Sequence, residues 1–231
     1  MRIAYIHIPK CGGTAMQAHL VDRIGKDRSL AIGALKHGAQ IEMASDFETW
    51  RSALDGVRLA YGHFFWPAFK DLANRLNAPA FSPVAVVREP LTRAVSEYNY
   101  ISQFPTHDLH AKVQQMTLDE YLLELHVNNI QCKFMTQSDL FVPALQVIEE
   151  EFACIAPLDE IDEFSARLMQ DLKLPQAPVV PKNVGGQTRD KLVIDPDVTS
   201  EFYERNVADL RMYWWVRRNW RSHWKVSGAA V

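Results

Sequence analysis

The chain has 231 residues, of which 48% are hydrophobic and 23% are charged. This length and composition allow a substantial buried core and fit one α/β domain better than two. A formal net charge of −3 and a sequence pI near 6.2 argue against a general nucleic-acid-binding protein. The three cysteines show neither metal-ligand spacing nor an even-numbered disulfide framework, so we expect free thiols in a reducing compartment.

Short apolar runs alternate with helix-compatible segments, which predicts a three-layer α/β fold with a central, mainly parallel sheet flanked by helices. We expect strands near residues 3–8, 57–62, 83–88 and 152–156. We expect helices near residues 14–24, 67–76, 90–103, 117–126, 128–136, 140–150, 160–172 and 197–222. Segment 105–116 has no clear period and is expected to be a long loop over one rim of the sheet, with His107 and His110 solvated rather than bound to a metal.

The first predicted strand ends at a glycine-rich turn. Pro9 and Lys10 interrupt the apolar run, and Gly12, Gly13 and Thr14 precede the next helix. Glycines let the backbone approach an anion, and the free N–H groups and positive dipole end of the helix point into such a turn. The lysine adds a mobile positive charge. The turn therefore predicts a site for a phosphate or sulfate group, although an ordinary helix start fits the same residues.

This turn differs from the triphosphate-binding loop G-x-x-x-x-G-K-[ST], because the lysine precedes the glycines and the loop is shorter. The sequence therefore does not predict the loop geometry that binds a nucleoside triphosphate with magnesium. The G-x-G-x-x-G fingerprint of dinucleotide-binding proteins is also missing from the sequence.

A second strand, break and helix follow at residues 83–104. Arg88 stands at the carboxyl end of this predicted strand, Pro90 fits the first turn of the helix, and Ser96 lies about two turns along it. Ligands of open α/β sheets bind outside the carboxyl ends of the strands, so Lys10 and Arg88 should emerge on the same rim. Two anion-binding elements on one rim indicate a ligand with two separated anionic groups.

Pro-Lys-Cys-Gly-Gly-Thr at residues 9–14, with Arg-Glu-Pro-Leu-x-Arg-Ala-x-Ser-x-Tyr-x-Tyr at 88–100, resembles the two cofactor motifs of sulfotransferases that use 3′-phosphoadenosine 5′-phosphosulfate. The most similar branch contains the carbohydrate sulfotransferases typified by heparan sulfate 2-O-sulfotransferase and its bacterial relatives. The resemblance implies a P-loop-like fold and 3′-phosphoadenosine 5′-phosphate as the cofactor product. It also implies that Arg88 and Ser96 hold the 3′-phosphate, while the 5′-phosphosulfate is held by Lys10, Cys11, Gly12, Gly13, Thr14 and Ala15.

In the same branch a Gly-His pair at the end of the second strand supplies the catalytic base, and Gly62 and His63 match it. By that resemblance His63 removes the proton of the acceptor hydroxyl, since a histidine pKa of about 6.5 leaves much of the side chain neutral near pH 7. Lys10 is expected to stabilise charge on the departing phosphate oxygen. Packing against Phe64 and the aromatic residues after it is the alternative for His63.

The resemblance implies in-line transfer of a sulfuryl group to a hydroxyl-bearing acceptor, with a saccharide as the first choice. A sulfuryl group carries less charge than a phosphoryl group, so we expect no required metal ion. Weaker matches at residues 128–134, 156–164 and 181–184 imply acceptor contacts from Asn128 and Gln131, with Phe64 as a third candidate, although both amides also fit a helix surface. Two alternatives stay open: a kinase-like, nucleotide-dependent transferase of small molecules, and a non-catalytic binding protein with a nucleotide fold.

Two residues near the first turn carry separate expectations. Cys11 departs from the small polar or aliphatic residue usual in the family, and a thiol beside Lys10 and a helix N-terminus should have a lowered pKa. This predicts a reactive or redox-sensitive thiol. His7 is expected to pack within the first strand rather than to act as a second base.

The last predicted helix interleaves tryptophans and tyrosines with arginines. We expect its Leu210 and Trp214 face to pack on the sheet, and partner binding, including homo-oligomer formation, is the alternative.

Residues 1–224 are expected to form a single sulfotransferase domain, followed by a short tail at 225–231. The first predicted strand begins three residues from the N-terminus and no stretch of about 18 apolar residues follows, so we expect a cytoplasmic bacterial protein without a membrane span.

Overall fold

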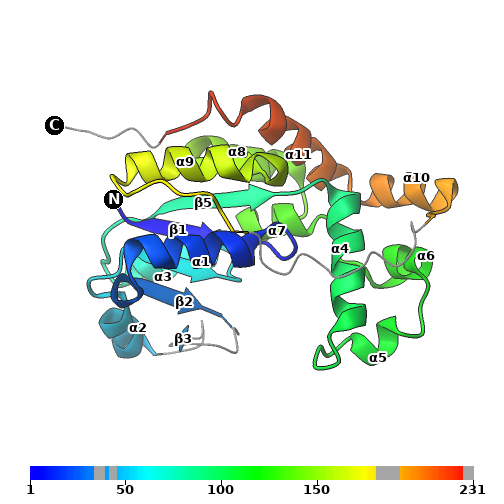
Figure 1. Cartoon of the computed structure of the whole chain (residues 1–231), viewed down its shortest axis with the longest axis horizontal. Coiled ribbons are helices and arrows are strands. Elements are labelled where there is room, and N and C mark those ends of the chain that lie inside the picture. The colour runs from blue at the N-terminus through cyan, green and yellow to red at the C-terminus, as the bar shows by residue number, and fades with distance from the viewer. Residues whose placement is uncertain (34–39, 42–45, 181–192, 226–231) are drawn as a thin grey trace.

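The structure is a computed structural model that describes residues 1–33, 40–41, 46–180 and 193–225. Within these ranges six strands form one sheet in the order β3-β2-β4-β1-β5-β6, and all of these neighbours pair in parallel (Figure 1). The strands are β1 (Ile3–Ile6), β2 (Ser29–Ile32), β3 (Gln40–Ile41), β4 (Leu59–Gly62), β5 (Ser82–Val87) and β6 (Cys154–Pro157). Every residue of β1 and β6 is buried, as expected for parallel strands covered on both faces.

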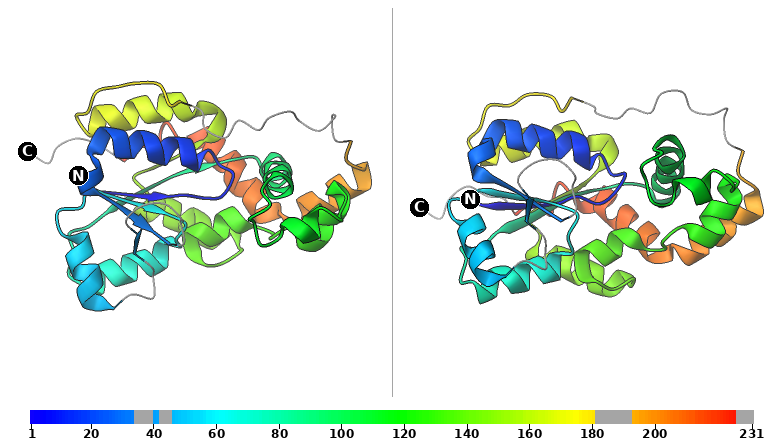
Figure 2. Two further views of the ribbon diagram at one scale, coloured as in Figure 1. Left: turned by 60° about the horizontal axis from the view of Figure 1, so that its bottom comes forward. Right: turned by 90° about the horizontal axis from the view of Figure 1, so that it is seen from below.

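Helices cover both faces of this sheet. The helices α1 and α9 lie over one face, and α3, α7 and α8 lie over the other (Figure 2). The longer helices are α1 (Gly13–Ile24), α2 (Phe47–Leu54), α3 (Trp66–Arg75), α4 (Pro90–Gln103), α7 (Ile130–Thr136), α8 (Phe141–Glu151), α9 (Ile161–Asp171), α10 (Pro196–Arg205) and α11 (Val207–Asn219). The short elements are η1 (Lys26–Arg28), α5 (His110–Val113), α6 (Leu118–Glu120), η2 (Tyr121–Leu125) and η3 (Leu158–Glu160). The predicted P-loop-like, three-layer α/β fold is confirmed.

A smaller helical lobe lies beyond the carboxyl ends of the strands, at the right of Figure 1. It has its own hydrophobic cluster, separate from the main core under the sheet, which joins α4 to α5, α6, η2 and α10. The buried residues of this cluster are Ala94, Tyr98, Ile101, Val113, Leu118, Tyr121, Leu122 and Phe202. The carboxyl rim of the sheet therefore faces a second body of protein.

The four predicted strands are confirmed, with ends that differ by no more than two residues. The strands β2 and β3 and the helix α2 were not predicted. A four-residue run and a two-residue strand are too short to show a periodic pattern, because period-2 and period-3.6 patterns need more residues to differ. The N-cap of α2 is Asp46, whose side chain accepts a hydrogen bond from the Thr49 N–H at 2.9 Å.

Three predicted helical or loop segments need correction. The predicted loop at 105–116 contains the short helix α5. The predicted helix at 117–126 is the capped turn α6 followed by the π-helical turn η2. The predicted helix at 197–222 is two helices, because Asn206 leaves the helical path between α10 and α11.

No helix in the described ranges is long and apolar enough to cross a membrane. Lys182, segment 181–184 and most of the predicted tail, residues 226–231, lie outside those ranges.

Candidate anion-binding and catalytic site

The glycine-rich turn between β1 and α1 has an unusual backbone. Lys10 and Gly12 both adopt left-handed conformations, with φ of 67° and 73°, and Gly12 is the N-cap of α1. Left-handed residues within a tight turn aim successive N–H groups into one concavity, which suits an anion. The first hydrogen bond of the helix runs from the Met16 N–H to the Gly12 carbonyl at 3.2 Å. The N–H groups of the first turn, including those of Thr14 and Ala15, therefore lack an intrahelical partner.

The second glycine of the turn is required for packing as well. A Cβ atom at Gly13 would lie 1.7 Å from the His7 ring, so a side chain there would displace the histidine. His7 is buried, and its Nδ1 is hydrogen-bonded to the Gln17 Oε1 at 3.0 Å. Burial lowers the pKa of His7 to about 3, so the ring is neutral at physiological pH. The expected packing of His7 is confirmed, and it packs against the start of α1.

Arg88 follows the last residue of β5 and meets the turn. Its Nη1 donates to the Lys10 carbonyl at 3.2 Å, so the two predicted anion-binding elements are in direct contact. The next residue, Glu89, caps α4, because its carboxylate accepts the N–H groups of Leu91 and Thr92 at 3.0 and 2.7 Å. Burial lowers the pKa of Arg88, but an arginine remains protonated near neutral pH.

Lys10 lies half-buried between the sheet rim and α4. Its Nζ sits 3.9 Å from the centre of the Tyr100 ring, a cation–π contact. Burial lowers the pKa of Lys10 to about 8; the nearby Glu97 carboxylate opposes this shift, whereas Arg88 and Arg93 favour it. Most Lys10 side chains are still charged at pH 7, and they lie close to two other cations, an arrangement that attracts a multiply charged anion.

His63 lies at the carboxyl end of β4, next to the turn. Gly62 has a φ of 147°, and a Cβ atom there would lie 1.9 Å from the Ile32 carbonyl oxygen at the end of β2. This close approach requires glycine and sets the position of His63. The His63 ring stacks on His7, with ring centres 4.2 Å apart, and its Nδ1 is buried without a hydrogen-bond partner among the described residues. Burial lowers the pKa of His63.

Cys11 and Gln131 meet beside Arg88, and both are fully buried. The Cys11 Sγ lies 3.5 Å from the Gln131 Oε1, and the Gln131 amide bonds both backbone groups of Arg88. The expectation of a lowered thiol pKa is wrong: burial raises the pKa of Cys11 to about 12, although Arg93 and Arg88 oppose the shift. Desolvation of the thiolate outweighs the nearby positive charges.

The remaining predicted site residues lie farther from this contact network. Phe64 is buried against Phe69, with ring centres 4.9 Å apart, whereas the next residue, Phe65, is exposed. The Asn128 Oδ1 accepts a hydrogen bond from Asn206 at 3.0 Å, between α10 and α11. Ser96 lies half-buried on α4. Phe64 and Gln131 therefore turn inward, and Asn128 is engaged by another part of the protein.

A buried ionic cluster behind the turn was not predicted. Arg93 is 1% exposed and donates to the Glu97 carboxylate at 2.8 Å and to the Pro9 carbonyl at 3.4 Å. Glu97 also accepts a hydrogen bond from the Tyr121 hydroxyl at 2.8 Å, and His126 Nδ1 lies 3.5 Å from it. The sequence feature that could have predicted part of this cluster is the spacing of Arg93 and Glu97, which lie four residues apart on one predicted helix.

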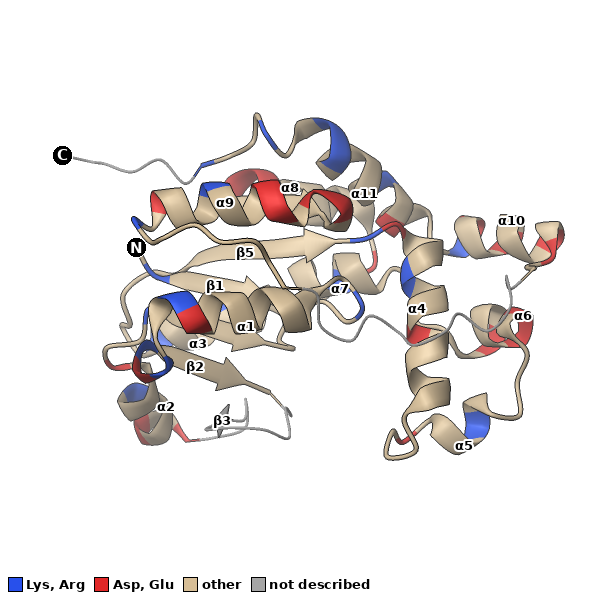
Figure 3. Ribbon diagram, in the orientation of Figure 1, with Lys and Arg blue, Asp and Glu red and all other residues tan. Residues whose placement is uncertain are grey.

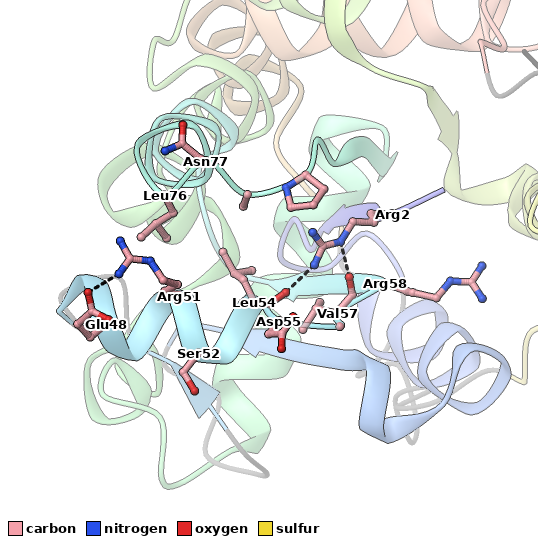
Figure 4. Close-up of a pocket in the computed structure, with 13 residues that line it drawn as sticks. Arg2, Glu48, Arg51, Ser52, Leu54, Asp55, Val57, Arg58, Leu76 and Asn77 are labelled. Carbon is pink, nitrogen blue, oxygen red and sulfur yellow. Dashed lines mark hydrogen bonds and ion pairs between the residues drawn. The ribbon is translucent and has the colours of Figure 1, made fainter.

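A cavity of about 680 Å³ lies elsewhere, near the amino ends of the strands (Figure 4). It is lined by Arg2, by Leu54 at the end of α2 and Val57 after it, and by Leu76 and Pro79 before β5, among others. The Arg2 guanidinium is hydrogen-bonded to the Leu54 and Val57 carbonyls, so these donors serve a structural contact rather than a ligand. The opposite rim, with the turn and Arg88, remains the candidate site.

The aromatic residues of the C-terminal region mostly serve the core. Met212, Val216 and Trp220 are buried, whereas Trp214 is 47% exposed, so the prediction that Leu210 and Trp214 form the packed face is wrong. Basic residues near the end of α11 lie beside acidic residues near the start of α9 (Figure 3).

The two histidines of segment 105–116 were expected to be solvated. The His110 Nδ1 contacts the Ile101 carbonyl at 2.8 Å. No group of three or more potential metal ligands occurs in the described ranges.

Comparison with known proteins adds family evidence to this geometry. Residues 1–170 match the family model described as "Sulfotransferase family". No curated protein matches the chain significantly. The fold is similar to the crystal structure of a sulfotransferase from Alicyclobacillus acidocaldarius, with a TM-score of 0.51 and 15% identity over 96% of this chain and 99% of that chain. It is also similar to a mouse sulfotransferase in complex with PAP, with a TM-score of 0.50 and 13% identity over 96% of this chain and 88% of that chain.

The two structural likenesses, at such low identities, show the fold alone. The family match is independent of them and spans more than half of the chain, including the glycine-rich turn, Gly62-His63 and Arg88. The chain belongs to the sulfotransferase family.

Proposed function

We propose that the protein transfers a sulfuryl group from 3′-phosphoadenosine 5′-phosphosulfate to an acceptor hydroxyl by in-line displacement. The observation that carries the proposal is the direct contact between Arg88 and the Lys10 carbonyl, which joins two anion-binding elements at one rim of the sheet. A cofactor with separate 5′ and 3′ anionic groups fits two such elements. The PAP bound to the similar mouse sulfotransferase supports this choice.

In this proposal the N–H groups at the start of α1, from Gly12 to Ala15, hold the 5′-phosphosulfate. The Cys11 N–H donates to the Ile8 carbonyl at 3.3 Å and its thiol stays in the core, so Cys11 shapes the turn rather than contacting the anion through either group. Lys10 balances the negative charge that gathers on the departing phosphate oxygen, where a fixed cation is worth more than in water. Arg88 and Ser96 hold the 3′-phosphate. Positioning and electrostatics supply most of the rate enhancement. Because a sulfuryl group carries less charge than a phosphoryl group, the proposal includes no metal ion.

His63 acts as the general base in this proposal. Its lowered pKa keeps the imidazole neutral near pH 7, which leaves a nitrogen lone pair to accept the proton of the attacking hydroxyl. The stack on His7 fixes the orientation of the ring. Because His7 also packs on Gly13, the base and the cofactor turn are held to one another through a single side chain.

A saccharide is the acceptor class that we propose. The exposed Phe65 lies beside Phe134, with ring centres 5.3 Å apart, and Phe134 lies 6.5 Å from the His63 ring. An aromatic edge near the base offers a surface on which a sugar ring can stack. The similarity to the two sulfotransferase structures covers 96% of this chain, which supports one sulfotransferase domain over residues 1–224.

Calorimetric titration with 3′-phosphoadenosine 5′-phosphate in the absence of magnesium tests this function. We expect micromolar binding to the wild type that is weakened at least tenfold by Lys10→Ala and by Arg88→Ala, since each removes a charge-assisted contact of about 1.5–3 kcal/mol. The control is Lys26→Ala, which removes an exposed charge after the far end of α1. A folded wild type that does not bind, or binds only with magnesium and ATP, would contradict the proposal.

A further inference from the structure

Gln131 connects the two anion-binding elements. It has no exposed surface, and both ends of its side-chain amide are hydrogen-bonded. Its Oε1 accepts the Arg88 N–H at 2.9 Å and lies 3.5 Å from the Cys11 Sγ, and its Nε2 donates to the Arg88 carbonyl at 2.8 Å. One buried side chain thus contacts both the cofactor turn and the residue that follows β5.

These hydrogen bonds extend the sheet by one residue. The last pairing between β5 and β6 joins Val87 to Pro157. Arg88 follows this pairing, and the Gln131 amide bonds both its N–H and its carbonyl, as a neighbouring strand would. Because the Arg88 side chain in turn donates to the Lys10 carbonyl, the backbone and the side chain of Arg88 are both fixed relative to the turn.

The helix that carries Gln131 is itself held in place. The fully buried Asp209 of α11 accepts the N–H groups of Gln131 and Cys132 at 3.0 and 2.8 Å, which caps the start of α7. In return the Asn129 Oδ1 accepts the N–H groups of Ala208 and Asp209 at 3.1 Å. Because residues at the start of each helix cap the other, α7 is fixed relative to α11, and the position of Gln131 is fixed with it.

We infer that Gln131 is a positioning residue that sets the separation between the subsite of the glycine-rich turn and the subsite of Arg88. The inference rests on the proposed function, because it concerns how that site receives a ligand with two anionic groups. A bis-anionic ligand gains affinity from its second contact only when both subsites stand at the right spacing. A ligand with one anionic group does not depend on that spacing.

The test compares two ligands on the same protein. The first is 3′-phosphoadenosine 5′-phosphate, and the second is adenosine 5′-phosphate, which lacks the 3′-phosphate. Gln131→Met fills a similar volume without the hydrogen bonds. We expect it to weaken binding of the first ligand roughly tenfold or more and of the second by less than about threefold. The ratio of the Kd for adenosine 5′-phosphate to the Kd for 3′-phosphoadenosine 5′-phosphate should therefore fall.

Two further variants make the result decisive. Gln131→Leu, like Gln131→Met, offers neither an acceptor for the Arg88 N–H nor a donor for its carbonyl, and it should also lower the ratio. Met135→Ala removes a buried side chain of the same helix that is not bonded to Arg88 or Cys11, and it should keep the wild-type ratio. Thermal unfolding of each variant shows that the protein compared is folded.

A wild-type ratio in both folded Gln131 variants would overturn the inference, as would an equal loss of affinity for both ligands, which a purely structural role predicts. Failure of the wild type to bind 3′-phosphoadenosine 5′-phosphate would instead contradict the proposed function. The wild-type titration alone separates these two failures.

Discussion

The two stacked histidines of the site differ in their surroundings, which gives them different roles. His7 is bonded to Gln17 and packed on Gly13, and burial lowers its pKa to about 3. His63 is half-buried, and burial lowers its pKa although a contact with the His7 backbone opposes the shift. Its Nδ1 has no hydrogen-bond partner among the described residues. His63 is therefore the residue that we propose exchanges a proton with a ligand. The sequence predicted the motif at Gly62-His63, but the stack depends on a strand pairing 56 residues apart in the chain, Ile6 with Gly62.

Replacement of His63 should separate chemistry from cofactor binding. We expect His63→Ala to lower turnover roughly 10²–10⁴-fold, because a general base contributes about that much, while the Kd for 3′-phosphoadenosine 5′-phosphate changes little. The matched control is His223→Ala, which removes a half-buried histidine bonded to the Ile148 carbonyl, away from the turn. Loss of cofactor-product binding in a folded His63→Ala protein would count against the base assignment.

The pH dependence of the same reaction has a predicted sign. In the proposed mechanism protonation of His63 removes the base, so we expect kcat/KM to fall as the pH drops through the pKa of His63. Because burial lowers that pKa, the acid limb should lie below pH 6.5, the ordinary value for histidine. An acid limb above pH 6.5 that disappears in His63→Ala would show that the histidine is not desolvated as described.

The cysteines should be inert despite the cations near Cys11. All three, Cys11, Cys132 and Cys154, are buried, and burial raises each thiol pKa. We expect a chromogenic disulfide reagent to label none of them within minutes in the native protein and all three after unfolding. Rapid labelling of one thiol in the native protein, mapped to Cys11 by peptide mass, would contradict the burial described here.

At the scale of elements, the cluster behind the turn links the helical lobe to the glycine-rich turn. Arg93 and Glu97 belong to α4, Tyr121 begins η2, and His126 follows it, while Arg93 also reaches the Pro9 carbonyl. The motif in α4 could be predicted from its proline and its spacing, and α4 has the predicted bounds. The π-helical turn could not, because its wider backbone ring depends on this cluster and on packing against α10 rather than on local propensity.

Removal of the acidic member of this cluster should destabilise the protein. Burial alone would raise the pKa of Glu97, but hydrogen bonding and the charge of Arg93 lower it below its ordinary value. The contribution of the carboxylate is therefore complete at neutral pH and is lost as the pH falls below about 4.5. We expect Glu97→Gln to lower the free energy of unfolding by about 2–4 kcal/mol at pH 7, as measured in urea, because Arg93 is left buried without its charged partner.

The control for this variant is Glu124→Gln, an exposed position in the same lobe, which should change the free energy of unfolding by less than about 0.5 kcal/mol. The difference between the wild type and Glu97→Gln should also shrink from pH 7 to pH 3. A constant difference across that range would mean that the carboxylate charge is not the source of the stability.

At the scale of the whole molecule, the sequence predicted the parts of the site that lie within continuous motifs. The turn at Lys10 to Thr14 and the segment from Arg88 into α4 are such motifs, and the parallel sheet brings them to one rim. The roles of Gln131 and Asp209 could not be predicted, because their partners lie 43 and about 78 residues away in the chain. An amide or carboxylate that satisfies a distant backbone carries no local pattern. Phe64 and Phe65 show the same limit, since the β4–α3 connection decides which ring is buried.

The most direct test of the account is a crystal structure of the protein with 3′-phosphoadenosine 5′-phosphate. We predict that the 5′-phosphate lies against the N–H groups of Gly12 to Ala15 and Lys10, with the 3′-phosphate at Arg88 and His63 open to the acceptor side of the cofactor. The account would be contradicted by a ligand bound elsewhere, for example in the cavity beside Arg2 at the opposite rim. It would also be contradicted if no ligand were bound at saturating concentration.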